Sequence, residues 1–316
     1  MGESSAAQAG SAMPVIILNP TSAGGRARRL RPLLERAVRQ GRAELLLTKG
    51  PRDAERIARE AASVGRDVIA VGGDGTASEV ANGLLAAGTG VTLGIVPCGT
   101  GNDYAHRTLG LPADPARALE IALTGVPLAM DVGLLNDRYF TNSVGVGIDA
   151  NINVAANNLK RVPLLRGQAL YWAASLTELI FHYNRCPELT VEVDGEPPTS
   201  RTYALAALTL GPTYGGGFEI NPGADPRDGL LDLCTLAKPS QLRALRLLPL
   251  VEKGQHLDQP EVTQRRVRAV TMAAVGPIYA HIDGEVMRAA RFEARVVPGA
   301  LRVRQPARDS GDVSDA

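Results

Sequence analysis

Short apolar runs alternate with longer segments of helical period in the first part of the chain. The runs are rich in Val, Ile and Leu, as buried strands are, and each ends at a turn signal such as Asn-Pro, Gly-Gly or Pro-Cys-Gly. Because parallel strands need a crossover connection, which is usually a helix, this alternation predicts successive βαβ units. We expect the strands VIIL, ELLL, VIAV and LGIV, and helices at residues 28–39, 53–63 and 78–86.

The pattern changes after residue 125. Strand-like segments such as ELTVEVDG and TYALAALTLG are separated by Gly, Pro and Asp turns, which predicts mainly antiparallel β structure. Two helical patterns, at residues 165–183 and 240–252, interrupt it. We therefore expect two domains: an α/β domain with a parallel sheet over residues 14–125, and a β-rich domain over residues 126–306 whose last strand could return to the first domain.

Composition narrows the class of protein. Hydrophobic residues make up 45% of the chain and charged residues 21%, as in ordinary globular proteins, and a net charge of +1 gives no support for a nucleic-acid partner. No apolar stretch is long enough to span a membrane, and the chain begins without the features of a secretory signal. The three cysteines have no CxxC spacing, so we expect neither disulfides nor zinc, and a cytoplasmic location. Residues 1–13 and 307–316 are expected to be disordered tails.

The segment VGGDGTASEVANGL, residues 71–84, contains the first candidate site. An apolar strand leads into Gly72, Gly73, Asp74, Gly75 and Thr76, and a helix is expected to follow. Glycines let the backbone approach a phosphate closely, and free amides at a helix N-terminus favour an anion. An aspartate there would repel bare phosphate, which points to binding of Mg²⁺ or to proton transfer from an acceptor hydroxyl. The alternative is a tight turn in which the aspartate only caps the helix.

A second glycine-rich loop lies in GIVPCGTGNDYA, residues 94–105. It again follows a strand and contains Gly99, Thr100, Gly101, Asn102 and Asp103. Loops at the ends of neighbouring parallel strands face each other across the carboxyl edge of the sheet, where ligands of open α/β sheets bind. A third segment, ILNPTSAGG, ends the first strand and supplies hydroxyl and amide donors; it is either a phosphate contact or an ordinary Asn-Pro turn.

These blocks resemble a known family. NPTSAGG, GGDGT and PCGTGNDYA, in this order and at this spacing, are similar to the catalytic region shared by diacylglycerol kinases, sphingosine kinases and bacterial lipid kinases. The resemblance continues through MDVGLLNDRYFTNSVGVGIDA, YGGGFEINPGADPRDGLLDL and HIDGE, so it covers nearly the whole chain outside both tails. It implies an α/β nucleotide-binding domain like that of phosphofructokinases and NAD kinases, a β-sandwich-like lipid domain, and ATP in the cleft between them.

The resemblance also implies roles for single residues. Asp74 becomes the catalytic acid and, with Asp103, a ligand of Mg²⁺. Glu285 and Asp131 are implied to be catalytic as well: Glu285 belongs to the element that reaches back from the second domain to the nucleotide and metal, and Asp131 to the surroundings of the acceptor hydroxyl. Asp228 matches a turn that holds a structural Mg²⁺ in some bacterial members. The nucleotide contacts carried over are Asn19, Thr48, Gly72, Gly73, Asp74, Gly75, Thr76, Gly99, Thr100, Gly101, Asn102, Asp103, Asp283 and Glu285.

Two of these segments have ordinary structural alternatives. Asp283 and Gly284 lie between strand-like runs, and Asp-Gly is the commonest hairpin signal. The residues around Asp228 are also typical of a turn that leads into a strand.

The function expected from the resemblance is an ATP- and Mg²⁺-dependent lipid kinase, with diacylglycerol as the foremost acceptor and phosphatidic acid as its product. The lipid must come from a membrane surface, and the helical segment 165–183, with Arg161, Arg166, Tyr171 and Trp172, either lies at that interface or packs on the β-rich domain. The alternatives are an NAD kinase-like enzyme and a non-catalytic regulator that binds lipid or nucleotide. A homodimer is left open, as is the identity of the acceptor lipid.

Overall fold

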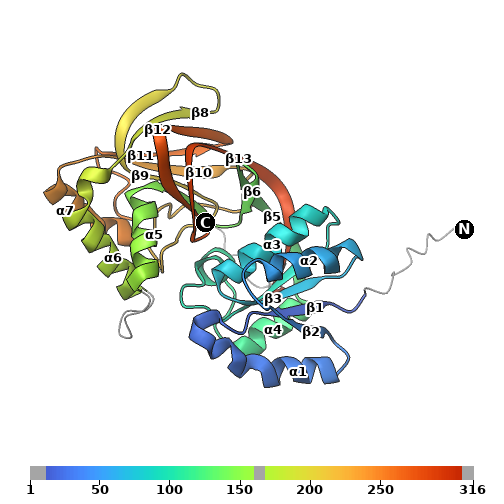
Figure 1. Ribbon diagram of the computed structural model, residues 1–316. Coiled ribbons are helices and arrows are strands. Elements are labelled where there is room, and N and C mark those ends of the chain that lie inside the picture. Colours follow the sequence, from blue (N-terminus) through green and yellow to red (C-terminus); the bar gives the residue numbers. More distant parts are fainter. Residues whose placement is uncertain (1–11, 160–167, 308–316) are drawn as a thin grey trace, which may run out of the picture.

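The computed structural model describes residues 12–159 and 168–307 (Figure 1). Within these ranges the chain forms two lobes that share one continuous array of hydrogen-bonded strands. The expected tails lie almost entirely outside the described residues. So do Arg161, Arg166 and the start of the helix expected at residues 165–183.

The first lobe is a parallel sheet with the strand order β4-β3-β1-β2. Its helices cover both faces, which explains why its inner strands are apolar throughout. Alternate residues of β1 face opposite layers: Val15 and Ile17 pack with α2 and α3, whereas Ile16 and Leu18 pack with α1 and α4. The strands are β1 (Val15–Leu18), β2 (Glu44–Leu47), β3 (Val68–Gly72) and β4 (Thr92–Pro97). The helices are η1 (Ser22–Leu30), α1 (Arg31–Arg39), α2 (Asp53–Ser63), α3 (Asp74–Ala87), η2 (Tyr104–Thr108) and α4 (Pro115–Thr124).

Helix α3 begins four residues earlier than expected from the sequence. Gly73 adopts an extended conformation as its N-cap, and its carbonyl accepts hydrogen bonds from the amides of Thr76 (3.0 Å) and Ala77 (3.1 Å). The prediction of a helix that starts near residue 78 was therefore wrong, because glycine-rich composition obscured the first turn. Asp74 is the first residue of the helix and not part of a preceding loop.

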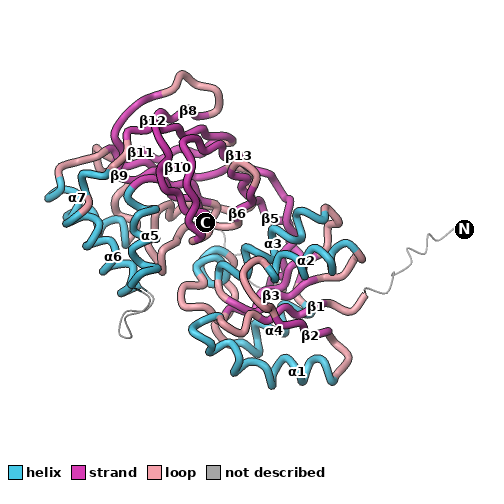
Figure 2. The backbone as a smooth tube through the Cα atoms, viewed as in Figure 1, coloured by secondary structure: helices cyan, strands magenta, loops and turns pink. Residues whose placement is uncertain are grey.

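The second lobe is mainly antiparallel, with the strand order β11-β10-β9-β7-β12-β13 and with β8 paired to β9 and β12. Helices α5, α6 and α7 pack against one face of it (Figure 2). The strands are β5 (Val126–Leu135), β6 (Arg138–Phe140), β7 (Ser143–Gly147), β8 (Glu188–Val193), β9 (Thr199–Thr209), β10 (Leu231–Ala237), β11 (Val262–Val267), β12 (Ala269–Ile282) and β13 (Glu285–Gln305). The helices are α5 (Ile148–Leu159), α6 (Gln168–Phe181), η3 (Tyr183–Arg185) and α7 (Gln241–Glu252).

Strand β13 joins the two lobes. Its first half pairs with β12, and its last residues pair with β4 of the parallel sheet through Arg302 and Val303. Strand β5 runs antiparallel to β13 along much of this length. Near the end of β13 the Arg304 guanidinium binds the Asp67 carboxylate at 2.8 Å. The lobes are thus connected by backbone hydrogen bonds as well as by the covalent chain.

The helix expected at residues 240–252 is confirmed as α7, whose N-terminus is capped by the Ser240 hydroxyl. In the described part of the helix expected at residues 165–183, α6 is observed. None of the described helices combines the length and the apolar character that crossing a membrane requires.

Substitution of Gly83, in α3, tests how closely α2 packs on α3. A Cβ atom at Gly83 would lie 2.3 Å from the Glu55 carbonyl oxygen and 2.9 Å from the Ala58 Cβ atom. Alanine normally stabilises a helix relative to glycine, but here the overlap forces the helices apart. We expect Gly83→Ala to lower the free energy of unfolding by about 1–3 kcal/mol in urea denaturation.

The matched control is Gly50→Ala, since a Cβ atom at Gly50 meets nothing within 4 Å. We expect this control to be neutral or slightly stabilising. Equal stability of the two variants would contradict the close approach of α2 and α3.

Candidate active site

The turn after β3 places a helix N-terminus at the carboxyl edge of the parallel sheet. Gly72 is required by packing, because a Cβ atom there would lie 2.4 Å from the Cβ atom of Thr76. The first amides of α3 have no partner within their own helix and therefore favour an anion in front of it. The Thr76 hydroxyl accepts a hydrogen bond from Asn19 Nδ2 (3.1 Å), which ties the end of β1 to this turn.

The loop after β4 is locked by one side chain. Asn102 Oδ1 accepts a hydrogen bond from the Gly99 amide (2.8 Å), and Asn102 Nδ2 donates to the Gly99 carbonyl (3.2 Å). Asn102 has a positive φ of 56°, a conformation that asparagine tolerates better than most residues. The loop also touches the first turn, since a Cβ atom on Gly99 would lie 2.6 Å from the Cα atom of Gly73. The two glycine-rich turns are therefore in direct backbone contact.

Asp74 receives hydrogen bonds from this second loop. Its Oδ2 accepts from the Asn102 amide (2.8 Å), and its Oδ1 from the Tyr104 amide (3.3 Å). Burial, reinforced by the nearby Asp103 carboxylate, raises the pKa of Asp74 to about 6. Asp74 is therefore ionised at neutral pH but titrates close to it, as a group that accepts a proton from an alcohol should.

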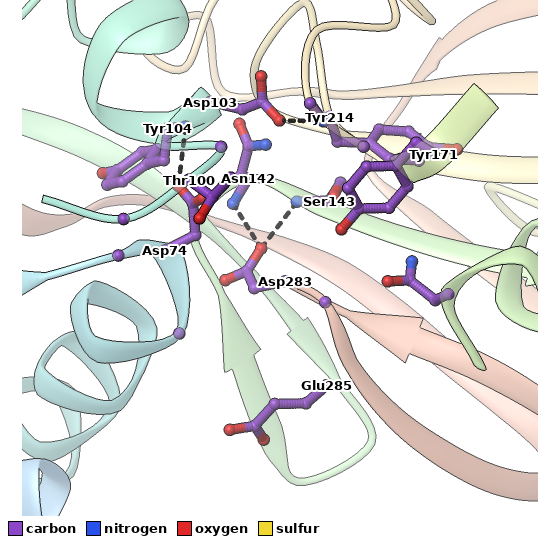
Figure 3. Close-up of a pocket in the computed structure, with 18 of the residues that line it drawn as sticks. Asp74, Thr100, Asp103, Tyr104, Asn142, Ser143, Tyr171, Tyr214, Asp283 and Glu285 are labelled. Carbon is purple, nitrogen blue, oxygen red and sulfur yellow. Dashed lines mark hydrogen bonds between the residues drawn. The ribbon is translucent and has the colours of Figure 1, made fainter. Parts of the chain in front are cut away.

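Asp103 lies opposite Asp74 and connects the two lobes. Its Oδ2 accepts a hydrogen bond from the Gly216 amide of the second lobe (2.8 Å), and Arg107 Nε lies 3.7 Å from its Oδ1. Burial raises the pKa of Asp103. Both carboxylates line a cleft of about 640 Å³ between the lobes, shown in Figure 3.

Asp283 forms the wall of the cleft on the second lobe. Its two carboxylate oxygens accept four hydrogen bonds, from the amides of Thr141, Asn142 and Ser143 and from the Thr141 hydroxyl, at 2.8–3.1 Å. Figure 3 shows it beside Asn142 and Ser143, with dashed lines for hydrogen bonds between them. Most of its lone pairs are used within the protein, so its main effect is to position the start of β7.

Glu285 also lines the cleft and stands apart from the other carboxylates in Figure 3. Its side chain is 40% exposed, and its Oε2 lies 3.5 Å from Arg138 Nη2. The same arginine contacts Glu55 of α2 through Nη1 (3.0 Å). The ion pair therefore spans the two lobes at the mouth of the cleft.

The structure separates the sequence-predicted residues into two groups. Those that line the cleft are Gly73, Asp74, Gly75, Gly99, Thr100, Gly101, Asp103, Asp283 and Glu285. Those that do not are Asn19, Thr48, Gly72, Thr76, Asn102, Asp131 and Asp228. Within the second group, Asn19, Gly72, Thr76 and Asn102 hold the two turns in place. Two residues of η1 also line the cleft: Ser22 of the third segment adds a hydroxyl, and Arg26, which follows that segment, adds a cation.

Asp131 and Asp228 lie elsewhere in the structure. The Asp131 oxygens accept hydrogen bonds from the amides of Gly229 (2.7 Å) and Gly299 (2.8 Å), so this side chain fastens a turn to the bulge of β13. Asp228 caps its own turn through the Leu230 amide (3.0 Å). In the described ranges no three His, Cys, Asp or Glu side chains are grouped as a metal site would need.

Sequence reasoning missed a buried polar cluster at the back of the cleft. Asp149 Oδ2 accepts hydrogen bonds from the Tyr214 hydroxyl (2.7 Å) and from His281 Nε2 (2.8 Å). Burial and the Asp149 charge raise the pKa of Tyr214. His281 is buried in this network and also lines the cleft. The three residues are far apart in the sequence, so no local pattern could indicate their contact.

An apolar pocket adjoins the cleft at this point. Tyr171, Tyr214 and Gly215 line both cavities. The walls of the apolar pocket are otherwise formed mostly by aliphatic side chains of α5, α6, α7, β9 and β10: Ile148, Ile152, Leu179, Ala204, Leu205, Leu236, Ala244, Leu247, Leu248 and Val251. The site therefore has a polar half with carboxylates and a hydrophobic half.

The polar half fits a nucleotide with Mg²⁺. Mg²⁺ is usually bound by one or two carboxylates together with phosphates and water. Among the described residues, the half-buried Asp74 forms no ion pair, and the buried Asp103 has Arg107 at 3.7 Å. The Asp103 charge adds to burial in raising the pKa of Asp74, and a cation between the two carboxylates would relieve that repulsion. The free amides of the glycine-rich turns suit phosphate oxygens.

Comparison with known proteins agrees with this geometry. The family described as "Diacylglycerol kinase catalytic domain" matches residues 14–135, and "YegS C-terminal NAD kinase beta sandwich-like domain" matches residues 142–305. A diacylglycerol kinase of Mycobacterium tuberculosis is 35% identical over 80% of this chain and 82% of its own. A diacylglycerol kinase of Bacillus subtilis is 31% identical over 74% of this chain and 76% of its own length. A probable YegS-like lipid kinase of Chromohalobacter salexigens is 36% identical over 80% of this chain and 81% of its own length.

The fold agrees as well. The crystal structure of a diacylglycerol kinase from Bacillus anthracis superposes with a TM-score of 0.69 at 21% identity, covering 93% of this chain and 97% of that one. The chain thus belongs to the diacylglycerol kinase catalytic-domain family, and it is a lipid kinase. The family implies ATP as the phosphoryl donor. The sequence-based prediction of the family and of the enzyme class is confirmed.

Asp283 provides a test of the cleft wall. Asp283→Asn removes one acceptor oxygen and turns an amide group toward backbone donors, while asparagine tolerates the positive φ of 46° at this position. We expect the free energy of unfolding to fall by about 1–3 kcal/mol, measured by urea denaturation. Glu285→Gln, at an exposed position, is the matched control and should change it by less than about 0.5 kcal/mol. An Asp283→Asn variant as stable as this control would contradict a positioning role.

Proposed function

We propose that the protein is an ATP- and Mg²⁺-dependent diacylglycerol kinase that converts diacylglycerol to phosphatidic acid. The observation that carries the proposal is the junction of two cavities: a cleft lined by Asp74 and Asp103, and an apolar pocket that shares Tyr171, Tyr214 and Gly215 with it. A lipid alcohol likewise has a polar and an apolar part, with a hydroxyl at one end and acyl chains at the other. The relatives named diacylglycerol kinase support this choice of acceptor.

The nucleotide would lie across the two glycine-rich turns. The amides at the N-terminus of α3 and those of Thr100 and Gly101 would bind phosphate oxygens, while Ser22 and Arg26 of η1 line the same cleft. Mg²⁺, when bound by Asp74 and Asp103, offsets charge on the β- and γ-phosphates. Most of the rate of phosphoryl transfer comes from such positioning and electrostatic stabilisation.

Asp74 would act on the acceptor hydroxyl. It is held by the Asn102 and Tyr104 amides, so its carboxylate has a fixed orientation toward the cleft. Its raised pKa makes it a better proton acceptor than an exposed aspartate. The lipid would enter with the first methylene groups of a chain in the apolar pocket, whose volume is about 90 Å³, and with its hydroxyl beside Asp74, in line with the γ-phosphoryl group.

The direct test is transfer of ³²P from γ-labelled ATP to a panel of acceptors in mixed micelles: diacylglycerol, monoacylglycerol, phosphatidylglycerol, sphingosine, undecaprenol and NAD. We expect label in diacylglycerol, and we expect Asp74→Asn to lower turnover by at least about two orders of magnitude, since the proton acceptor is lost. Asp137→Asn, on the exposed turn after β5, is the matched control and should retain full activity.

Each other outcome has a distinct meaning. Label in another lipid alone would replace diacylglycerol as the acceptor. Label only in NAD would favour the NAD kinase-like alternative. ATP binding without any transfer would favour the non-catalytic regulator.

The titration of Asp74 in the metal-free protein tests its surroundings. Because bound Mg²⁺ lowers the pKa of a carboxylate that binds it, the titration is followed without Mg²⁺ by NMR, and we expect the Asp74 carboxyl to titrate at about 6. Burial is the first cause of the raised pKa and the Asp103 charge the second, so Asp103→Asn should move the Asp74 titration to lower pH. An Asp74 titration that stays in place in Asp103→Asn would contradict the proximity of the two carboxylates.

A further inference from the structure

Large apolar side chains are exposed where α6 ends and α7 begins. Phe181 is 74% exposed, Ile180 47% and Leu242 60%, and Leu176, one helical turn before Ile180, is 38% exposed. Single exposed apolar residues are ordinary, but a group of four on two adjoining helices is a typical interaction site. These four residues are called the α6–α7 patch below.

The two helices hold the α6–α7 patch together. The Gln241 side-chain amide donates to the carbonyl oxygens of Leu179 (2.8 Å) and Ile180 (2.9 Å), so the first turn of α7 abuts the last turn of α6. The Tyr183 hydroxyl donates to the Pro239 carbonyl (2.7 Å) just before α7. Figures 1 and 2 show α6 and α7 beside each other on the outer side of the second lobe, away from the first lobe.

Basic side chains surround the α6–α7 patch. Arg185 and Arg246 are exposed, and Lys238 is half-buried with its Nζ 5.1 Å above the ring of Tyr183. Across the ranges that the structure describes, none of these three cations forms an ion pair with a carboxylate. The nearest acid of α6, Glu178, is buried and bonded to His182 (2.9 Å). The surface is therefore apolar at its centre and positively charged at its edge.

The same helices also form walls of the apolar pocket. Leu179 of α6 and Leu247 and Leu248 of α7 face the pocket, while Ile180 and Leu242 face outward. The pocket in turn reaches the catalytic cleft at Tyr171. A lipid that leaves a bilayer at the α6–α7 patch thus has only the thickness of these two helices between it and the pocket proposed for its chains.

We propose that the α6–α7 patch docks the enzyme on an anionic lipid bilayer. The inference rests on the proposed lipid-kinase function, which requires an acceptor held in a bilayer. Phe181, Ile180 and Leu242 enter the boundary between headgroups and acyl chains, and Arg185, Lys238 and Arg246 contact lipid phosphates. An anionic bilayer fits better than a protein partner, because the cations around the patch have no carboxylates of their own and the helices lead to the acceptor pocket.

The test combines vesicle binding with two forms of the substrate. Phe181→Ser is compared with wild type for co-sedimentation with vesicles of phosphatidylglycerol and phosphatidylcholine that contain diacylglycerol. We expect its affinity to fall by about tenfold or more, as removal of one inserted aromatic side chain predicts. Activity on these vesicles should fall similarly, whereas activity on monomeric short-chain diacylglycerol should not change. Arg185→Gln with Arg246→Gln should weaken binding to anionic vesicles and leave the weak binding to pure phosphatidylcholine unchanged.

Val64→Ser is the matched control, because Val64 is an equally exposed apolar residue (68%) in the first lobe. It should behave as wild type in every assay. Phe181→Ser that binds vesicles as wild type does would overturn the docking surface. So would a wild-type dimer in analytical ultracentrifugation that Phe181→Ser dissociates, since the patch would then join two copies of the chain. Failure of wild type to phosphorylate the monomeric lipid would instead overturn the proposed function, while sedimentation still reports on docking.

Discussion

The contact between two glycine backbones is the constraint on which the site depends. Gly73 at the start of α3 and Gly99 after β4 approach so closely that a Cβ atom on Gly99 would lie 2.6 Å from the Cα atom of Gly73. Only this approach lets the amides of Asn102 and Tyr104 reach the Asp74 carboxylate. Asp74 and the amides proposed to bind phosphate are therefore parts of one backbone unit, whose geometry would require little reorganisation during the proposed reaction.

The second lobe completes the site because β13 ties it to the same sheet. Pairing of the end of β13 with the start of β4 joins the two sheets, and the hairpin that carries Asp283 and Glu285 lines the cleft together with the glycine-rich turns. The Gly216 amide then binds Asp103 from the opposite side. With the apolar pocket behind Tyr171 and Tyr214, a lipid hydroxyl and a nucleotide phosphate can meet between two separately stabilised hydrophobic cores.

Local pattern was sufficient for the strands of the parallel sheet, for α7 and for the turns that contain Asp74 and Asp103. Local pattern was insufficient where contacts between residues distant in the sequence determine the start of a helix or the partners of a side chain. The start of α3 was placed too late because the glycine-rich first turn has low helix propensity and is stabilised by packing of Thr76 on Gly72. The role of Asp131 near the acceptor stays a prediction from resemblance, and its hydrogen bonds to the Gly229 and Gly299 amides could not be read from local pattern. The cluster of Asp149, Tyr214 and His281 arises only from tertiary pairing of α5, β12 and the loop before β10.

The central claim is that Asp74 lies beside the metal and the transferred phosphoryl group. Crystals grown with a non-hydrolysable ATP analogue and Mn²⁺ test it directly, because anomalous scattering locates the metal independently of the refined protein atoms. The account predicts an Mn²⁺ peak at ligand distance from a carboxylate oxygen of Asp74, with the phosphates against the amides of Thr100 and Gly101. A nucleotide bound in the cleft with its metal and γ-phosphate remote from Asp74 would contradict it.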